Sequence, residues 1–177
     1  TQRSSQIALK GAPSFLHKSS EGLNVLTMEE VMPHNRKNGT LTFISQENGV
    51  LGEAEILLDN LPRPVHAAVN DLDGDGKDDM VICAFGNYTG ELAWYSDIFS
   101  ANRKKHVLSV LPGAIKSVID DVNGDGLPDV LALMAQGDEG FYLFLNQGNG
   151  TFKEEVLMRF PATYGSTYFE WKDMDGD

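Results

Sequence analysis

Residues 71–79 read DLDGDGKDD, residues 121–129 read DVNGDGLPD, and the same pattern begins again as DMDGD at residues 173–177. The three segments begin at Asp71, Asp121 and Asp173, so they recur at intervals of 50 and 52 residues. Self-similarity at a fixed period of 20 to about 50 residues is typical of propellers, solenoids and repeat arrays. The sequence therefore predicts a repeat protein.

Other features recur with the same period. A glycine is followed four residues later by an aromatic residue, and an apolar residue and a proline come about twenty residues after that glycine. These landmarks are Gly39, Gly90 and Gly140, then Phe43, Trp94 and Phe144, then Leu61-Pro62, Leu111-Pro112 and Phe160-Pro161. Because several kinds of landmark keep one order and one period, the repeat unit is about 50 residues long.

Within each unit the pattern indicates strands and gives no long amphipathic helix. Short apolar or aromatic runs alternate with turn residues, as buried strands do. The expected strands are 64–70, 80–83, 91–95 and 107–111 in one unit, and 114–120, 130–133, 141–145 and 156–158 in the next. Four short strands per unit are the content of one propeller blade. We therefore predict an all-β fold, a β-propeller fragment of four-stranded blades.

The repeats also predict how the chain is divided. We expect the chain to be a piece of a longer protein, because the last unit is cut within its motif. Residues 22–61 resemble the later part of a unit without an Asp-rich loop. The expected organisation is an unassigned segment 1–21, a partial blade 22–61, complete repeats 62–111 and 112–161, and the start of a further repeat at 162–177.

The Asp-rich loops predict metal sites. Side-chain oxygens at positions 1, 3, 5 and 9 and the backbone carbonyl at position 7 can face one centre, while glycines at positions 4 and 6 permit the turn. An all-oxygen set favours Ca²⁺ over softer metals. The expected ligands are Asp71, Asp73, Asp75, Lys77 and Asp79 in the first loop, Asp121, Asn123, Asp125, Leu127 and Asp129 in the second, and Asp173, Asp175 and Asp177 in the third.

Two other structures, an EF-hand and a plain solvated turn, could contain Asp-rich and Gly-rich loops. An EF-hand needs a bidentate Glu at position 12, where the two complete loops have Ile82 and Ala132, and it needs helices at both sides. Solvated turns rich in Asp and Gly are the other alternative. They do not explain the repeated positions 1, 3, 5 and 9. Four carboxylates around one point also repel, by about 4 kcal/mol per pair at about 4 Å and an effective dielectric near 20.

The motif Asp-x-Asp/Asn-Gly-Asp-Gly-x-x-Asp between strands, in units of about 50 residues, resembles the FG-GAP or VCBS repeats of integrin-type β-propellers. The resemblance covers roughly residues 22–177. It implies that each loop joins the first and second strands of a blade, with calcium bridging it. It also implies an extracellular, cell-surface or periplasmic protein.

The net charge and the absence of known catalytic motifs limit the classes of function that this sequence fits. The chain has 26 acidic and 14 basic residues and a net charge of −12, which disfavours nucleic acid as a partner. No apolar stretch has the length of a membrane-spanning helix. No haem, nucleophile-elbow, phosphate-loop or zinc-protease motif occurs. We expect a non-catalytic module, its calcium structural, that binds protein or carbohydrate; the alternative is the propeller part of a secreted enzyme, acting on polysaccharide or redox substrates, with catalytic residues elsewhere.

One further position is a candidate for ligand contact. His66, Lys116 and Tyr168 each stand five residues before an Asp-rich motif. If the first strand of each unit lines a central channel, these side chains face it. The alternative is an ordinary outward-facing strand position.

Overall fold

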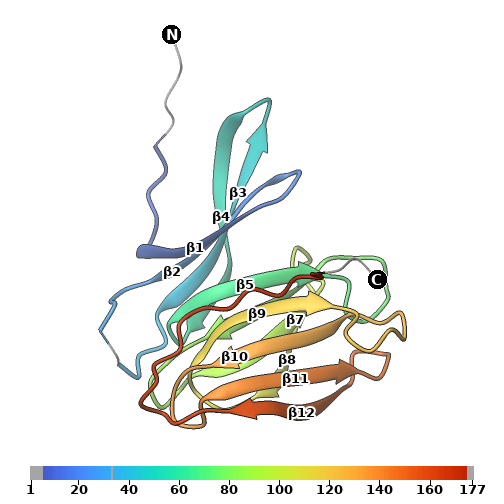
Figure 1. Ribbon diagram of the computed structural model, residues 1–177. Helices are drawn as coiled ribbons and strands as arrows, with labels where there is room; N and C mark the ends of the chain where they lie inside the picture. The colour runs from blue at the N-terminus through green and yellow to red at the C-terminus, as the bar shows by residue number, and fades with distance from the viewer. Residues whose placement is uncertain (1–5, 33, 175–177) are drawn as a thin grey trace.

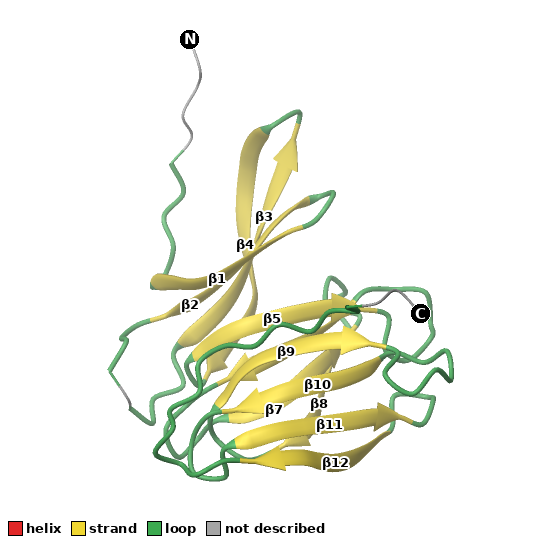
Figure 2. Cartoon of the chain, in the orientation of Figure 1, coloured by secondary structure: helices red, strands yellow, loops and turns green. Residues whose placement is uncertain are grey.

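The computed structural model describes residues 6–32 and 34–174, which form three four-stranded antiparallel sheets (Figure 1). No helix occurs in these residues (Figure 2), and accordingly none of them belongs to a helix long and apolar enough to cross a membrane. The fold is all-β, as predicted. In the first sheet the strands are β1 (Ala12–Lys18), β2 (Gly22–Met28), β3 (Gly39–Glu47) and β4 (Val50–Leu61).

The second and third sheets have the same up-and-down order as the first, with each strand pairing to the next along the chain. The second sheet comprises β5 (Pro64–Asn70), β6 (Asp79–Ala84), β7 (Glu91–Ser96) and β8 (Lys104–Ser109). The third comprises β9 (Ala114–Asp120), β10 (Asp129–Met134), β11 (Gly140–Asn146) and β12 (Phe152–Arg159). Each sheet is therefore built from one continuous stretch of chain.

The cores lie between neighbouring sheets, which explains the uninterrupted apolar runs. Every residue of β6 and of β10 is buried. Val81 and Cys83 of β6 belong to the core shared with the third sheet, whereas Met80 and Ile82 belong to the core shared with the first. A strand covered on both faces has no polar alternation. Trp94 of β7, 1% exposed, packs in the core between the second and third sheets.

The predicted strands 64–70 and 114–120 coincide with β5 and β9. The prediction for β8, the last strand of the second sheet, was displaced along the chain. Residues 107–111 were expected there, and β8 instead begins at Lys104 and ends at Ser109. Half of the residues of this outermost strand are exposed, so its sequence lacks the apolar pattern that locates a buried strand. β1 comes from the segment 1–21, for which no element was predicted.

The first strands of the three sheets lie side by side, with β5 next to both β1 and β9 (Figure 1). The Ser14 hydroxyl donates to the Pro64 carbonyl at 2.7 Å, and the Ser117 amide donates to His66 Nδ1 at 3.4 Å. The extended segment that follows β12 continues this series, because Lys116 Nζ donates to the Phe169 carbonyl at 2.7 Å. Each contact joins residues 50 to 53 positions apart.

Candidate metal centre

The first Asp-rich loop joins β5 to β6, the first and second strands of the second sheet. Asp71 closes the loop, because its Oδ1 accepts from the Gly74 amide at 2.8 Å and its Oδ2 accepts from the Gly76 amide at 2.9 Å. Both glycines have positive φ, 81° and 84°, in the left-handed region that other residues rarely adopt. The alternation of Asp and Gly therefore produces a tight turn that directs side chains inward.

The second loop repeats this backbone between β9 and β10. Asp121 accepts from the amides of Gly124 and Gly126, both at 2.8 Å, and these glycines have φ values of 75° and 85°. Because the two loops use the same hydrogen bonds at the same positions, the repeat seen in the sequence is also a repeat of local structure.

The ninth residue of each loop, Asp79 or Asp129, is fully buried at the first position of the second strand. Asp79 accepts from the amides of Leu72 and Asp97, both at 2.9 Å. These bonds connect the start of β6 to the loop on one side and to the end of β7 on the other. A buried carboxylate needs such donors.

Asp129 makes the equivalent bonds in the third sheet. It accepts from Val122 at 3.1 Å and from Asn146 at 2.7 Å. The ninth Asp of both loops is therefore a structural acceptor as well as a candidate ligand.

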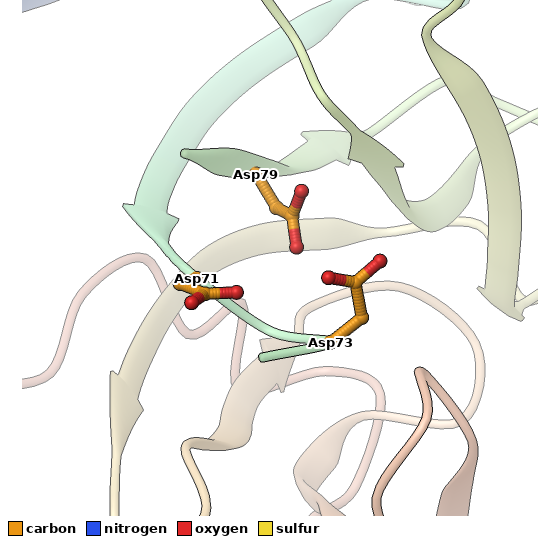
Figure 3. A group of neighbouring side chains, drawn as sticks. All are labelled: Asp71, Asp73 and Asp79. Atoms are coloured by element: carbon orange, nitrogen blue, oxygen red, sulfur yellow. The ribbon is translucent and has the colours of Figure 1, made fainter. Parts of the chain in front are cut away.

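In the first loop, the carboxylates of Asp71, Asp73 and Asp79 point toward one another (Figure 3). One oxygen from each lies within 4.8 Å of the others. Asp71 and Asp73 come from the loop, and Asp79 comes from β6. Three carboxylate oxygens converging in this way are a donor set suited to a hard divalent cation, of which Ca²⁺ takes six to eight oxygens. The donors at positions 1, 3 and 9 therefore fit the predicted metal.

The pKa of Asp79 is also consistent with a cation site. Burial raises the pKa of this carboxyl above its ordinary value, and the negative charges of Asp73 and Asp71 raise it further, against the lowering effect of its two backbone hydrogen bonds. A charge that is costly by itself becomes favourable once a cation balances it. The cluster is thus arranged so that a bound cation relieves an existing repulsion.

Asp75, the predicted ligand at position 5, is engaged elsewhere. Its carboxylate forms an ion pair with Lys77 Nζ at 2.7 Å, and Lys77 Nζ also lies 2.5 Å from Asp97. The hydrogen bond from Lys77 lowers the pKa of Asp75. The structure therefore brings together three of the four predicted side-chain ligands of the first loop, and a lysine at position 7 holds the fourth.

The second loop arranges its side chains differently. Position 3 is Asn123, whose Nδ2 donates to Asp125 Oδ2 at 2.9 Å. Positions 1, 3 and 9 consequently supply two carboxylates and one amide. Within the described residues, Asp121, Asp125 and Asp129 do not form a compact carboxylate group like that of the first loop. The carbonyls of Lys77 and Leu127 stay predicted ligands.

The third motif falls mainly outside the described part of the chain. Asp173 is described, whereas Asp175 and Asp177 lie outside the described residues. The prediction of a third loop at these residues therefore stays a prediction.

Two residues missed by the sequence analysis support the loops. Asn146, 1% exposed, donates from Nδ2 to the Leu72 carbonyl at 2.8 Å and to the Pro128 carbonyl at 3.1 Å, so it ties the first loop to the second. Asp97 supports the first loop through its amide and through Lys77. The only sequence signal was their place at a strand end, since Asp97 follows β7 and Asn146 is the last residue of β11.

His66, Lys116 and Tyr168 lie on adjacent segments of neighbouring units. Lys116 Nζ lies 3.6 Å from the centre of the Tyr168 ring, and the Phe15 ring packs 4.6 Å from that of His66. Burial lowers the pKa of His66 to about 4, and the positive charge of Lys116 contributes. The structure explains these residues as contacts between neighbouring units; ligand contact at this position stays a prediction.

Comparison with known families supports the repeat. Residues 121–177 match the family model described as an FG-GAP-like repeat. No curated protein and no solved structure matches the chain. The matched segment begins at Asp121, the first residue of the second loop, and includes β10, β11 and β12. The resemblance drawn from the motifs is thereby confirmed: the chain carries an FG-GAP-like repeat at residues 121–177.

Proposed function

We propose that residues 71–79 and 121–129 each bind one structural Ca²⁺ in a blade of a β-propeller, and that the protein is a binding module. The observation that carries the proposal is the convergence of Asp71, Asp73 and Asp79 on one point next to a buried strand end. A cation there would link the loop to β6. Since Asp79 also holds the end of β7, that link would extend across three strands of the sheet.

Calcium fits better than other metals for two reasons. All candidate ligands are oxygens, which excludes the thiolate and imidazole sites typical of zinc and copper. The loop also combines carboxylates and carbonyls in an irregular arrangement, whereas Mg²⁺ demands a near-ideal octahedron and keeps several waters.

The propeller arrangement is supported by the contacts between units. Hydrogen bonds at spacings of 50 to 53 residues join β1 to β5, β5 to β9 and β9 to the segment after β12. In the proposed propeller, successive units would be related by a similar step, with the first strand of each sheet innermost. Repeated steps of this kind place four-stranded sheets around an axis, as in the blades of a propeller.

We place the module on a secreted, periplasmic or cell-surface protein and expect it to bind a protein or a carbohydrate. Extracellular calcium modules have dissociation constants of about 10⁻⁴–10⁻³ M, so they are occupied only where calcium is abundant. The role assigned to calcium is stabilisation, because the candidate ligands also cap the turn and the strand ends.

Thermal unfolding with and without calcium tests the proposal. At 10 mM Ca²⁺, one site of this class raises the free energy of unfolding by about 2 kcal/mol. We therefore expect the midpoint of thermal unfolding to rise by about 4–8 °C relative to the protein in chelator. Mg²⁺ at the same concentration should give a smaller rise. Circular dichroism must show a folded protein in both buffers.

A matched pair of variants separates the loop from general charge effects. Asp73→Ala removes one carboxylate of the cluster, and Asp138→Ala removes an exposed carboxylate that pairs with Arg159. The calcium-dependent rise should shrink in Asp73→Ala and persist in Asp138→Ala. An equal rise in both variants, or none in the folded parent protein, would overturn the proposal.

A further inference from the structure

The outermost strand of the first sheet differs from its two counterparts. β4 has 12 residues, whereas β8 has 6 and β12 has 8. The hairpin of β3 and β4 projects beyond the other two sheets (Figure 1). In its upper part, residues 50–56, every residue except Leu51 is exposed. Below that, Arg103 Nη1 donates to the Leu57 carbonyl at 2.7 Å and covers the edge. The free edge therefore runs from Val50 to Ile56.

Edge strands expose unpaired amide and carbonyl groups, and proteins protect them with short length, lysine or proline. β8 contains Lys104 and Lys105, and β12 contains Lys153 and Arg159. β4 contains no lysine, arginine or proline. Within the described residues, its strand partner is β3 alone. This edge is therefore longer than the equivalent edges and carries acidic residues without the basic ones found on β8 and β12.

The charge on the hairpin indicates which strand fits. Residues 38–62 contain no lysine or arginine, and their acidic residues are Glu47, Glu53, Glu55 and Asp59. Two copies of β4 side by side would place like charges opposite one another, which is destabilising. A second copy of this chain is therefore a poor partner, and a basic strand is a good one.

Acidic and apolar residues alternate along the free edge of β4, which indicates the sequence pattern of a complementary strand. Glu53 and Glu55 alternate with Ala54 and Ile56, and successive side chains of a strand point to opposite faces. Ile56 is 49% exposed. A strand that alternates basic and apolar residues would set its cations against the glutamates and its apolar side chains against Ile56 and Ala54. Opposite charges and apolar pairs across strands both stabilise pairing.

We propose that the free edge of β4, residues 50–56, binds an extended basic segment of a partner protein by adding it as a fifth strand to the first sheet. Backbone hydrogen bonds supply the affinity, and the glutamates select the charge. This site is separate from the Asp-rich loops, residues 71–79 and 121–129, which lie in the second and third sheets.

The test uses the 177-residue chain and a labelled ten-residue peptide in which lysine and valine alternate. Fluorescence anisotropy should show saturable binding that weakens with salt, and the same peptide with glutamate in place of lysine should not bind. Hydrogen exchange should show alternate amides of residues 50–56 protected by the lysine peptide. Binding without that protection would overturn the proposal, as would no binding at all.

Matched charge reversals locate the site. E53K/E55K should weaken binding roughly tenfold or more, because two favourable cross-strand pairs become unfavourable. E154K/E155K makes the same change in net charge on β12 and should alter affinity by about twofold at most. If E53K/E55K does not fold, E53Q/E55Q supplies the comparison. Equal weakening by both pairs, or protection of residues 50–56 through self-association without peptide, would overturn the assignment.

Discussion

The two Asp-rich loops, residues 71–79 and 121–129, have the same backbone but different charges. In both, the first Asp caps two glycine amides and the ninth Asp is buried between two backbone donors. The first loop adds Asp73 and Lys77, where the second has Asn123 and Leu127. The shared positions hold the turn and the strand ends together, whereas the variable positions set the charge of each loop.

The largest effects are expected at the shared ninth position. Asp79→Ala and Asp129→Ala each leave two backbone amides without an acceptor, which costs about 3 kcal/mol of unfolding free energy. In chelator the loss should be smaller for Asp79→Ala, since its removal also relieves repulsion with Asp71 and Asp73. Urea unfolding, monitored by tryptophan fluorescence, measures the unfolding free energy of each variant.

Asp78→Ala is the matched control for this pair, because Asp78 is adjacent and exposed, and we expect a change within about 0.5 kcal/mol. A loss below about 1 kcal/mol in both ninth-position variants would show that the buried carboxylates do not hold the strand ends.

The second prediction exchanges the residues at position 3. Asp73→Asn removes a charge from the first loop, and Asn123→Asp adds one to the second. Calcium affinity should fall roughly tenfold in the first variant and rise roughly tenfold in the second, because each carboxylate adds attraction for the cation at close range. Competition with a chromophoric chelator measures the affinity of each loop when the other is disabled by its ninth-position variant.

Controls for the exchange carry the same charge change outside the loops. Asp138→Asn and Asn48→Asp alter exposed residues away from both loops, and neither should change calcium affinity by more than about twofold. If Asn123→Asp left the second loop unchanged, its amide would not be the reason for the difference between the loops.

The third prediction concerns pH and the first loop. Asp79 has a raised pKa, so in chelator the folded protein still holds this proton at pH values where the unfolded chain has released it. The contribution of Asp79 to stability therefore declines as pH rises from the ordinary aspartate value of 3.8 through the raised pKa. Calcium should reverse the sign, because a cation favours the carboxylate.

Carbon-13 NMR of the side-chain carboxyls measures the effect directly. In chelator the midpoint of Asp79 should lie above 3.8 and that of Asp75 below it, since Lys77 stabilises the Asp75 carboxylate. A midpoint for Asp79 below 3.8 in chelator would contradict the account of the cluster.

The fold was largely predictable, because buried strands carry a strong pattern. β5 and β9 were predicted at their observed bounds, and β6 and β10 were recognised by their apolar runs. β8 was misplaced and β1 was missed, because exposed edge strands have little periodicity and β1 is not followed by an Asp-rich loop that fixes the register. Periodicity records burial, and these strands are only partly buried.

For the site, spacing predicted which residues share a loop and could not predict the direction of each side chain. Asp71, Asp73 and Asp79 converge as expected, whereas Asp75 turns to Lys77. Lys77 also pairs with Asp97, which lies 20 residues further along the chain and is brought close by the sheet. The link from Asn146 to the first loop spans 74 residues and has the same origin.

The smallest expected effect comes from exchanging the residues at position 7. Lys77 is exposed, and exposed ion pairs contribute little to stability, so Lys77→Leu should leave the midpoint of urea unfolding nearly unchanged. Calcium affinity of the first loop should nevertheless rise a few-fold, because a competing cation next to Asp75 is lost. Leu127→Lys should weaken the second loop to a similar degree.

Salt distinguishes this charge effect from a change in the turn. The gain in Lys77→Leu should shrink at 0.5 M KCl, where screening shortens the range of the lysine charge, whereas a change in loop geometry would persist. Unaltered or weaker calcium binding in Lys77→Leu would show that Lys77 orders Asp75 for the metal instead of competing with it. In that case Lys77 helps to order the first loop, and any difference in calcium affinity between the two loops rests on position 3 alone.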